Sequence, residues 1–355
     1  MRIALVASPF ISVPPRKYGG TELFIAQLAE GLTRIGMDVV VYANGESTVN
    51  SEVRWLYPRG EWPITGELYS NLKDLNHTAW ALRDCWKDAD VVHLNNAPGL
   101  AFTRFGGPAV VYTVHHPSLS TLNDFYHHYP HVEYVTISRA QMNGNSLPRM
   151  RTIHHGVDLE FYDFQSVKRE YFAFLGRIAP VKGTHVAIEI AKKAGVPLKI
   201  AGEIQPTFRE YWQKQIEPHV DGKFIEYLGE ADLALKNELL GGAMALLFPI
   251  QWNEPFGLVM IEAMACGTPV IAFPGGAVSE VVSEHLSGYI CRNVNDAVAR
   301  VKDLKKLKPV NIRSYVQQHF SVERMVQEYC ALYRSIAGTA DNEITGEPEG
   351  PRAVA

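Results

Sequence analysis

Short runs of apolar residues recur along the chain, and they alternate with segments in which apolar residues return every three or four positions. The first pattern is typical of β-strands buried on both faces, and the second is typical of amphipathic helices. Strands joined by crossover helices form parallel sheets, so the sequence predicts an α/β fold. In the first half of the chain, the predicted strands are Arg2 to Ala7, Asp38 to Tyr42, Val91 to Leu94, Ala109 to Val114 and Glu133 to Ile137.

A second series of strands begins after residue 170 and predicts a second domain of the same kind. Its members are Tyr171 to Leu175, Leu198 to Ala201, Phe224 to Leu228, Ala245 to Phe248 and Pro269 to Ala272. We place the boundary at the segment 154–158, which gives an N-terminal domain of residues 1–158 and a C-terminal domain of residues 159–318. Open parallel sheets bind ligands beyond the carboxyl ends of their strands, so we expect a cleft between the domains.

The end of the chain predicts one more helix and then a tail. Apolar residues recur at helical spacing from Val322 to Ile336, so residues 319–336 are expected to form a packed C-terminal helix. Residues 337–355 are mostly polar or small and lack periodicity, which predicts a disordered tail.

Composition and charge narrow the class of protein. The 355 residues are 46% hydrophobic and 20% charged, which is enough apolar material for two ordinary cores. The net charge of -4 gives no support for binding to nucleic acid or to an anionic membrane. The four cysteines form no Cys-x-x-Cys pair, and no apolar run approaches the roughly 20 residues of a membrane span. We therefore expect a soluble, cytoplasmic protein with no nucleic-acid partner, and the oligomeric state stays open.

The segment from Trp252 to Gly267 carries the most information about function. Pro255 suits the first position of a helix, and Gly257 lets a ligand approach the backbone closely. The free amides and the dipole at such a helix N-terminus attract a diphosphate. We therefore expect the ligand-binding backbone to include Phe256, Gly257 and Leu258.

Two carboxylates flank this helix start. Glu254 falls just before the predicted helix and Glu262 lies within it, with seven residues between them. One carboxylate therefore faces the end of a bound ligand, while the other reaches along its length. An ordinary capped, amphipathic helix is the alternative interpretation of the same residues.

This Glu-x7-Glu spacing, with Pro-Phe-Gly inside it, resembles the family-four retaining glycosyltransferases of the GT-B fold. The order of predicted elements matches that family to about Ile336. The resemblance implies two Rossmann-like parallel-sheet domains that face an interdomain cleft, with the C-terminal helix crossing back to the first domain. It also implies that Glu254 approaches the hydroxyls of the donor sugar and that Glu262 holds the nucleotide ribose.

A second motif, from Gly176 to Gly183, follows the first predicted strand of the second domain. Arg177 can make a bidentate contact with phosphate oxygens, and Lys182 can add a point charge. The pair resembles the family's Gly-Arg…Lys-Gly element, in which these cations neutralise the donor diphosphate and the leaving group. Two solvated surface cations are the alternative. The chain has no Gly-x-x-x-x-Gly-Lys-Ser/Thr sequence, which disfavours a nucleotide triphosphatase.

In the first domain, the segment from Tyr18 to Glu22 lies between the first strand and the first helix. Gly19 and Gly20 allow this loop to approach a phosphate or a sugar, and Thr21 is predicted to cap the helix, whereas a merely tight turn is the alternative. The segment resembles the bacterial branch of the family that carries Tyr-Gly-Gly-Thr-Glu. Gly-x-Gly-x-x-Gly is absent, which disfavours an oxidoreductase.

Further positions enter through the resemblance. His115 matches the family's His after Thr-x, which approaches the donor sugar from the acceptor domain, whereas a hydrogen-bonded structural histidine is the alternative. The family often has Asp or Gly at the next position, so His116 has no assigned role. Ser138 matches a substrate-binding position that faces the cleft, and a turn cap is its competitor. Gly229 and Glu230 lie where the family passes the nucleobase.

No catalytic metal is predicted. Asp88-Ala89-Asp90 has the Asp-x-Asp form of metal-dependent transferases, but Asp90 immediately precedes a buried strand and so sits at its wrong end.

We therefore expect a metal-independent, retaining glycosyltransferase that moves a sugar from a nucleotide-diphosphate sugar to an acceptor hydroxyl. No separate cofactor is expected. His115, Glu254, Arg177 and Lys182 are the predicted catalytic residues, and no side chain is assigned as a nucleophile. The alternatives are a sugar-nucleotide epimerase or hydrolase on a similar scaffold, and a non-catalytic module that binds sugar nucleotides.

Overall fold

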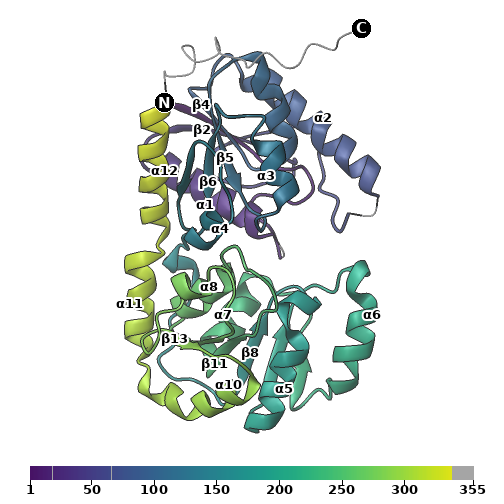
Figure 1. Cartoon of the computed structure of the whole chain (residues 1–355), viewed down its shortest axis with the longest axis vertical. Coiled ribbons are helices and arrows are strands. Elements are labelled where there is room, and N and C mark those ends of the chain that lie inside the picture. Colours follow the sequence, from purple (N-terminus) through teal and green to yellow (C-terminus); the bar gives the residue numbers. More distant parts are fainter. Residues whose placement is uncertain (18, 65, 338–355) are drawn as a thin grey trace.

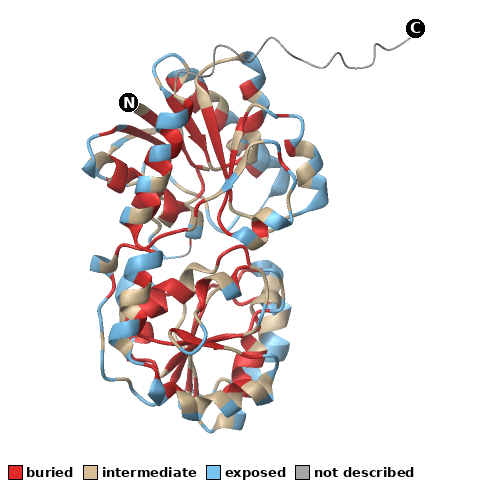
Figure 2. Cartoon of the chain, turned by 60° about the vertical axis from the view of Figure 1, so that its left-hand side comes forward, coloured by how far each residue is buried: buried red, intermediate tan, exposed pale blue. Residues whose placement is uncertain are grey.

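The computed structural model describes residues 1–17, 19–64 and 66–337, and in it the chain forms two lobes stacked end to end (Figure 1). Each lobe is built on one parallel sheet with helices around it. Buried residues lie along both sheets, and exposed residues lie mainly on the outer helices and loops (Figure 2). The α/β fold with two Rossmann-like domains is therefore confirmed. The tail expected after residue 337 lies outside the described residues.

The N-terminal domain contains a seven-stranded sheet in the order β3-β2-β1-β4-β5-β6-β7, in which all pairs are parallel. Its strands are β1 (Arg2–Val6), β2 (Asp38–Ala43), β3 (Glu52–Trp55), β4 (Val91–Leu94), β5 (Ala109–Val114), β6 (Glu133–Thr136) and β7 (Met150–Thr152). Its α-helices are α1 (Gly20–Arg34), α2 (Glu67–Cys85), α3 (Ser120–Tyr126) and α4 (Arg139–Asn143), and a 3-10 helix spans Ala97–Phe105.

The C-terminal domain contains a six-stranded sheet in the order β10-β9-β8-β11-β12-β13, again all parallel. Its strands are β8 (Phe172–Leu175), β9 (Leu198–Ala201), β10 (Ile225–Tyr227), β11 (Ala245–Phe248), β12 (Val270–Ala272) and β13 (Gly288–Ile290). Its α-helices are α5 (Thr184–Ala194), α6 (Arg209–Tyr211), α7 (Leu233–Gly242), α8 (Leu258–Ala265), α9 (Val278–Val281), α10 (Val294–Arg300) and α11 (Pro309–His319). Among the described residues, no helix combines the length and the apolar content needed to cross a membrane.

All ten predicted strands are present to within one residue at each end. The three strands that were not predicted, β3, β7 and β13, lie at the outer positions of the two sheets. No residue of β3 or β7 is buried, so neither strand has the apolar run that marks a central strand. Edge strands of this kind are recognised only from their pairing in the fold.

The two domains are joined where the chain crosses between them twice. Val157 pairs with Ser321 in a short parallel bridge, so the outgoing and returning segments lie side by side. Gly156 is needed here because a Cβ atom at this position would lie 2.4 Å from the carbonyl oxygen of Ser321.

After the second crossing, helix α12 (Val322–Ile336) packs on the N-terminal domain. Figure 1 shows α11 and α12 in yellow, running one after the other along the same side of the two lobes. The Tyr333 hydroxyl bonds His93 Nδ1 at 2.7 Å, and the Tyr329 hydroxyl bonds Thr113 Oγ1 at 2.9 Å. The end of the chain is thereby anchored to the first domain.

Side-chain contacts also link the two domains. The Glu280 carboxylate accepts from the backbone amides of Arg139 and Ala140 at 2.8 and 2.6 Å, at the start of α4. Trp62 Nε1 donates to Glu203 Oε1 at 2.8 Å. These contacts place the carboxyl ends of the two sheets opposite each other.

Candidate active site

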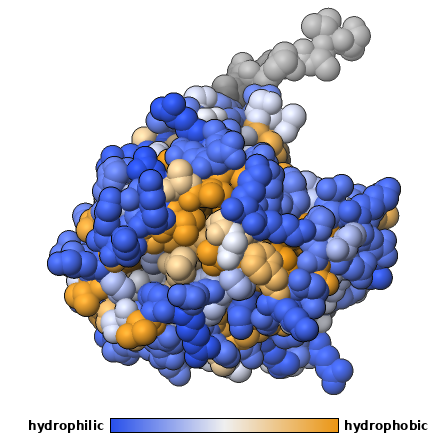
Figure 3. Space-filling view, turned by 90° about the horizontal axis from the view of Figure 1, so that it is seen from below, coloured by the Kyte–Doolittle hydropathy of each residue, from blue (hydrophilic) through white to orange (hydrophobic). Residues whose placement is uncertain are grey.

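A cleft of about 670 Å³ separates the two domains and is lined by residues of both. This volume lies within the range of about 300 to 1,000 Å³ that is common for small-molecule sites. The N-terminal domain contributes the loop before α1, the start of α1 and the residues after β5. The C-terminal domain contributes the residues after β8 and β11 and the start of α8. Seen from below, from the end of the molecule formed by the C-terminal domain, the surface is mostly hydrophilic and carries separate apolar patches (Figure 3).

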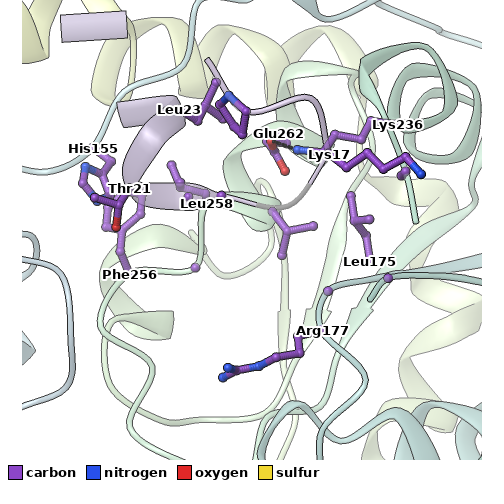
Figure 4. A pocket seen from close by; sticks show the side chains of 18 of the residues that line it. Lys17, Thr21, Leu23, His155, Leu175, Arg177, Lys236, Phe256, Leu258 and Glu262 are labelled. Carbon is purple, nitrogen blue, oxygen red and sulfur yellow. Dashed lines mark hydrogen bonds and ion pairs between the residues drawn. The ribbon is translucent and has the colours of Figure 1, made fainter. Parts of the chain in front are cut away.

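Two helix N-termini meet at this cleft. Helix α1 follows Gly19 and helix α8 follows Gly257, and both glycines have positive φ angles, of 143° and 84°. A Cβ atom on Gly20 would lie 3.4 Å from Leu258 Cδ1, so the two helix starts are close neighbours. Figure 4 shows Thr21 and Leu258 on this wall. Backbone amides at helix starts favour anionic ligands.

Two predictions about these helix ends are wrong. Pro255 does not occupy the first helical position, because the left-handed conformation of Gly257 delays the start of α8 to Leu258. Thr21 does not cap α1, because the N-cap residue is Gly19 and no side chain accepts from the helix amides there. Tyr18, the first residue of the proposed Tyr-Gly-Gly-Thr-Glu segment, lies outside the described residues.

Glu254 and Lys182, both predicted to be catalytic, are paired with each other. Lys182 Nζ lies 2.6 Å from Glu254 Oε2, and Trp252 Nε1 donates to the same oxygen at 2.8 Å. The Lys182 ammonium also lies over the Trp252 ring, 4.9 Å from its centre. Glu254 is only 7% exposed, and these two contacts compensate for the water that its carboxylate loses on burial.

Glu262 lies on the buried side of α8 and has its own pair of partners. Lys236 Nζ from α7 lies 2.8 Å from Glu262 Oε1, and the Tyr162 hydroxyl donates to the same oxygen at 2.9 Å. In Figure 4, Lys236 and Glu262 point toward one another at the upper edge of the cleft. Both contacts use Oε1, and Oε2 has no hydrogen bond to the described residues.

Arg177 lies just beyond the carboxyl end of β8, on a different part of the wall from Glu262 (Figure 4). Its Nη1 donates to Gln205 Oε1 at 3.4 Å, and its guanidinium lies 5.5 Å from the centre of the Phe208 ring. Its buried Nε has no hydrogen-bond partner among the described residues. A guanidinium with unused donors at a cleft is suited to phosphate oxygens.

His115 reaches the cleft from the opposite domain. Its ring stacks on His155 with centres 5.7 Å apart and an interplanar angle of 11°, and Phe24 packs against its edge at 5.1 Å. Burial, together with neighbouring His116, lowers the pKa of His115 to about 3, so its ring is neutral at physiological pH. His116 bonds the Tyr126 hydroxyl through Nε2 at 2.5 Å, on the same wall.

The remaining predicted site residues differ in their position relative to the cleft. Ser138 is fully buried and accepts from the amide of Gln141 at 3.0 Å as the N-cap of α4, and it is not part of the cleft lining. Glu230 lines the cleft, whereas Gly229 is not one of the lining residues, and its carbonyl accepts from the amide of Gly202 at 2.8 Å. A substrate-binding role for Ser138 stays a prediction.

The aspartates set aside in the sequence lie away from the cleft. Asp90 precedes the amino end of β4, and its carboxylate accepts from the backbone amide of Arg2 at 2.7 Å. Within the described part of the chain, no group of three or more His, Cys, Asp or Glu residues has an arrangement that could hold a metal ion.

Several residues that contact the predicted site residues were not themselves predicted. Tyr162, Lys236 and Trp252 bond the two motif glutamates, and Asn95 bonds His115. Two of them had a signal in the sequence: Asn95 directly follows a buried strand at the carboxyl end where ligands bind, and Trp252 stands two positions before Glu254 in the motif segment. Tyr162 and Lys236 have no spacing rule that relates them to the motifs.

Two facing parallel-sheet domains and a cleft lined by carboxylates, cations and helix N-termini define a protein of the GT-B class. Residues 18–161 match the family model described as glycosyltransferase family 4, and residues 160–317 match the model described as glycosyl transferases group 1. The chain belongs to glycosyltransferase family 4. The assignment to the bacterial Tyr-Gly-Gly-Thr-Glu branch stays a prediction.

The chain is also similar to curated glycosyltransferases. N-acetyl-alpha-D-glucosaminyl L-malate synthase of Bacillus anthracis is 25% identical over 210 residues, which are 53% of this chain and 54% of the relative. A glycogen synthase of Mycobacterium tuberculosis is 29% identical over 175 residues, which are 46% of this chain and 42% of the relative. The chain thus spans about half the length of the curated relatives it matches.

Solved structures share the fold over nearly the whole chain. A glycosyltransferase involved in avilamycin A biosynthesis has a TM-score of 0.69 and 24% identity, covering 96% of this chain and 98% of its own. Sucrose-phosphate synthase of Thermosynechococcus elongatus has a TM-score of 0.78 and 18% identity, with 94% and 98% coverage. Anabaena HepE in complex with UDP and glucose has a TM-score of 0.73 and 16% identity, with 94% and 100% coverage. The GT-B fold is thereby confirmed.

Proposed function

We propose that this chain transfers a sugar from a nucleotide-diphosphate sugar to an acceptor hydroxyl, with retention of the anomeric configuration and without a metal ion. One observation carries the proposal: a single cleft brings His115 and the Gly19–Gly20 loop against the Arg177, Lys182 and glutamate side chains of the other domain. Neither domain alone contains all of these groups. Transfer between two bound substrates needs such a two-sided site.

The diphosphate is the part of the donor that the chemistry of the cleft supports most directly. Arg177 has unused donors, Lys182 adds a cation, and the starts of α1 and α8 add backbone amides. These groups are suited to the charge that develops on a departing nucleoside diphosphate. Among proteins of this fold, Anabaena HepE has been solved with UDP-glucose, which makes a uridine nucleotide the first donor to test.

The pairing of Lys182 with Glu254 gives the site a defined response to a donor. When a diphosphate binds, its oxygens compete with Glu254 for the Lys182 ammonium. Glu254 then keeps its bond from Trp252 and has lone pairs free to accept from the hydroxyls of the sugar. This one exchange of partners thus provides Lys182 as a contact for the diphosphate and Glu254 as a contact for the sugar.

The remaining roles follow the same geometry. Glu262 holds the ribose hydroxyls through Oε2, while Lys236 and Tyr162 fix Oε1. His115 contacts the reacting sugar from the acceptor side as a neutral ring. The proposed transition state resembles an oxocarbenium ion. Charged and polar groups placed around it stabilise it, so the reaction needs no side-chain nucleophile. Because fixed cations and backbone amides balance the negative charge of the departing diphosphate, the proposed reaction requires no metal ion.

The acceptor is not assigned. The names of the similar curated proteins include an N-acetyl-alpha-D-glucosaminyl L-malate synthase, a glycogen synthase and a D-inositol 3-phosphate glycosyltransferase, which point to acceptors of different chemistry. We propose that the acceptor binds on the N-terminal side of the cleft, beside His116 and Arg16.

A two-stage experiment tests the proposed function. Nucleotide sugars are first screened for thermal stabilisation of the protein, since a ligand that binds the native state raises its unfolding temperature. The stabilising donor is then incubated with a panel of acceptor alcohols and sugars. Release of nucleoside diphosphate together with a new glycoside supports the proposal. Conversion of the donor sugar without acceptor indicates an epimerase, free sugar alone indicates a hydrolase, and binding without turnover indicates a binding module.

A further inference from the structure

Asn95 and His115 lie next to each other because their strands are neighbours. Asn95 directly follows β4, His115 directly follows β5, and the two strands pair in parallel. His115 Nε2 lies 2.9 Å from Asn95 Oδ1. The other ring nitrogen, Nδ1, has no hydrogen bond to the described residues, and the ring lines the cleft.

The orientation of the Asn95 amide is fixed from behind. Both its backbone amide and its side-chain Nδ2 donate to the carbonyl oxygen of Val6, at 3.0 and 3.3 Å. The Nδ2 group is therefore directed at Val6, and Oδ1 is directed at His115. A carbonyl oxygen only accepts hydrogen bonds, so His115 Nε2 must carry the proton of the neutral ring. Nδ1 is then unprotonated and has a lone pair.

The surroundings of His115 keep this tautomer uncharged. The titratable groups around the ring are His93 on β4, His116 on the following loop and His155 at the domain crossing, and a positive charge on His115 would repel any of them that became charged. Phe24 on α1 adds an apolar contact, and Lys182 and Glu254 line the cleft from the other domain.

We propose that Asn95 is a positioning residue that holds His115 in the Nε2-protonated tautomer, so that Nδ1 accepts a hydrogen bond from a hydroxyl of the bound sugar. This role rests on the proposed function. It assigns His115 the task of orienting the sugar through a lone pair, and it excludes His115 as a proton donor in the reaction. A purely structural asparagine would leave the tautomer of His115 unaffected.

The tautomer is measured directly by NMR. Protein labelled with [15N]histidine gives long-range 1H–15N correlations that distinguish the two neutral tautomers and the imidazolium, and the His115→Gln variant identifies the His115 signals by their loss. We expect the Nε2-protonated form in the wild type between pH 6 and 8. In Asn95→Leu the pattern should move toward a mixture of tautomers. An Nδ1-protonated wild type, or a pattern unchanged in Asn95→Leu, would overturn the proposal.

Asn95→Asp provides an isosteric second variant. A carboxylate beside Nε2 stabilises the imidazolium, so His115 should take up a proton at a higher pH than in the wild type. Protonation occupies Nδ1, and turnover should then fall about tenfold per pH unit below the raised pKa. The matched control is Asn96→Ala, since the Asn96 amide bonds Asp74 and Thr78 rather than His115. Thermal melting establishes that each variant is folded.

Turnover is measured first with UDP-glucose, or with the donor that stabilises the protein in the thermal screen described above. A fall in turnover between pH 7 and pH 4.5 in Asn95→Asp that exceeds any fall in the wild type and in Asn96→Ala supports the inference, because the carboxylate raises the pKa of His115 from about 3. An Asn95→Asp enzyme with the wild-type pH profile would overturn it. If no nucleotide sugar is turned over, the proposed function fails, and the NMR measurement still decides whether Asn95 sets the tautomer.

Discussion

Replacing Lys182 by alanine is expected to lower both the stability of the protein and its affinity for a nucleoside diphosphate. The ammonium lies 2.6 Å from a carboxylate that is only 7% exposed, and after the substitution that carboxylate keeps only its bond from Trp252. Loss of a charge-assisted hydrogen bond costs about 1.5 to 3 kcal/mol. The Lys182 side chain is 19% exposed, so we expect a loss of about 2 kcal/mol. For a domain of this size, that corresponds to a fall in Tm of roughly 4 to 8 °C.

The double variant Lys182→Ala/Glu254→Gln separates the two effects. A neutral amide at position 254 removes the unpaired buried charge, so most of the lost stability should return. Affinity should not return, because the cation that meets the diphosphate is still missing. A charge-assisted contact of 1.5 to 3 kcal/mol corresponds to a loss in affinity of roughly 10- to 150-fold.

The assay combines thermal unfolding with titration calorimetry, using UDP as the ligand. Wild type, both single variants and the double variant form a cycle in which stability and affinity are measured on the same samples. A Lys182→Ala protein as stable as the wild type would refute the role of the pair in stability. A double variant that recovers UDP affinity would refute the assignment of Lys182 to the diphosphate.

Three further predictions follow from the same structure. Glu262→Ala should weaken UDP binding, whereas His115→Ala should mainly lower turnover because it acts after the donor is bound; equal binding losses in the two variants would contradict this division. Transfer should continue in excess chelator, and an enzyme silenced by chelator and restored by magnesium or manganese would contradict it. Burial raises the pKa of Glu22 from 4.5 to about 7, so the stability associated with its protonated form is present below pH 4.5 and is lost as the pH rises through 7. At pH 8 the loss is about 3 kcal/mol, so the Tm advantage of Glu22→Gln over the wild type should grow from pH 5 to 8, and a constant difference would contradict the shift.

The central part of the fold was predictable because both faces of its strands are covered. Runs such as Val91–Leu94 and Ala245–Phe248 are fully buried, and only a continuous apolar sequence satisfies that environment. The edge strand Glu52–Trp55 has no buried residue, so its sequence carries no such mark. Its place is determined by backbone pairing with β2, which becomes visible only in the structure.

The site was predictable to the extent that it lies on loops after strands and at helix starts. The Arg177–Lys182 and Glu254–Glu262 motifs line one cleft with His115, as the resemblance implied. Their partners could not be predicted, because the contacts join residues far apart in sequence. Lys182 and Glu254 are 72 positions apart, and neither motif indicates that they bond each other. Likewise, the left-handed turn at Gly257 moved the start of α8 beyond Pro255.

The anomeric configuration of the product tests the proposed retaining transfer most directly. The donor selected by thermal stabilisation is incubated with the acceptor that it glycosylates, and the proton NMR coupling of the anomeric position is recorded in donor and product. For a retaining transferase we expect one equivalent of nucleoside diphosphate per glycoside, and a product with the same anomeric configuration as the donor. A product of inverted configuration, or release of the diphosphate with free sugar as the sole product, would contradict it.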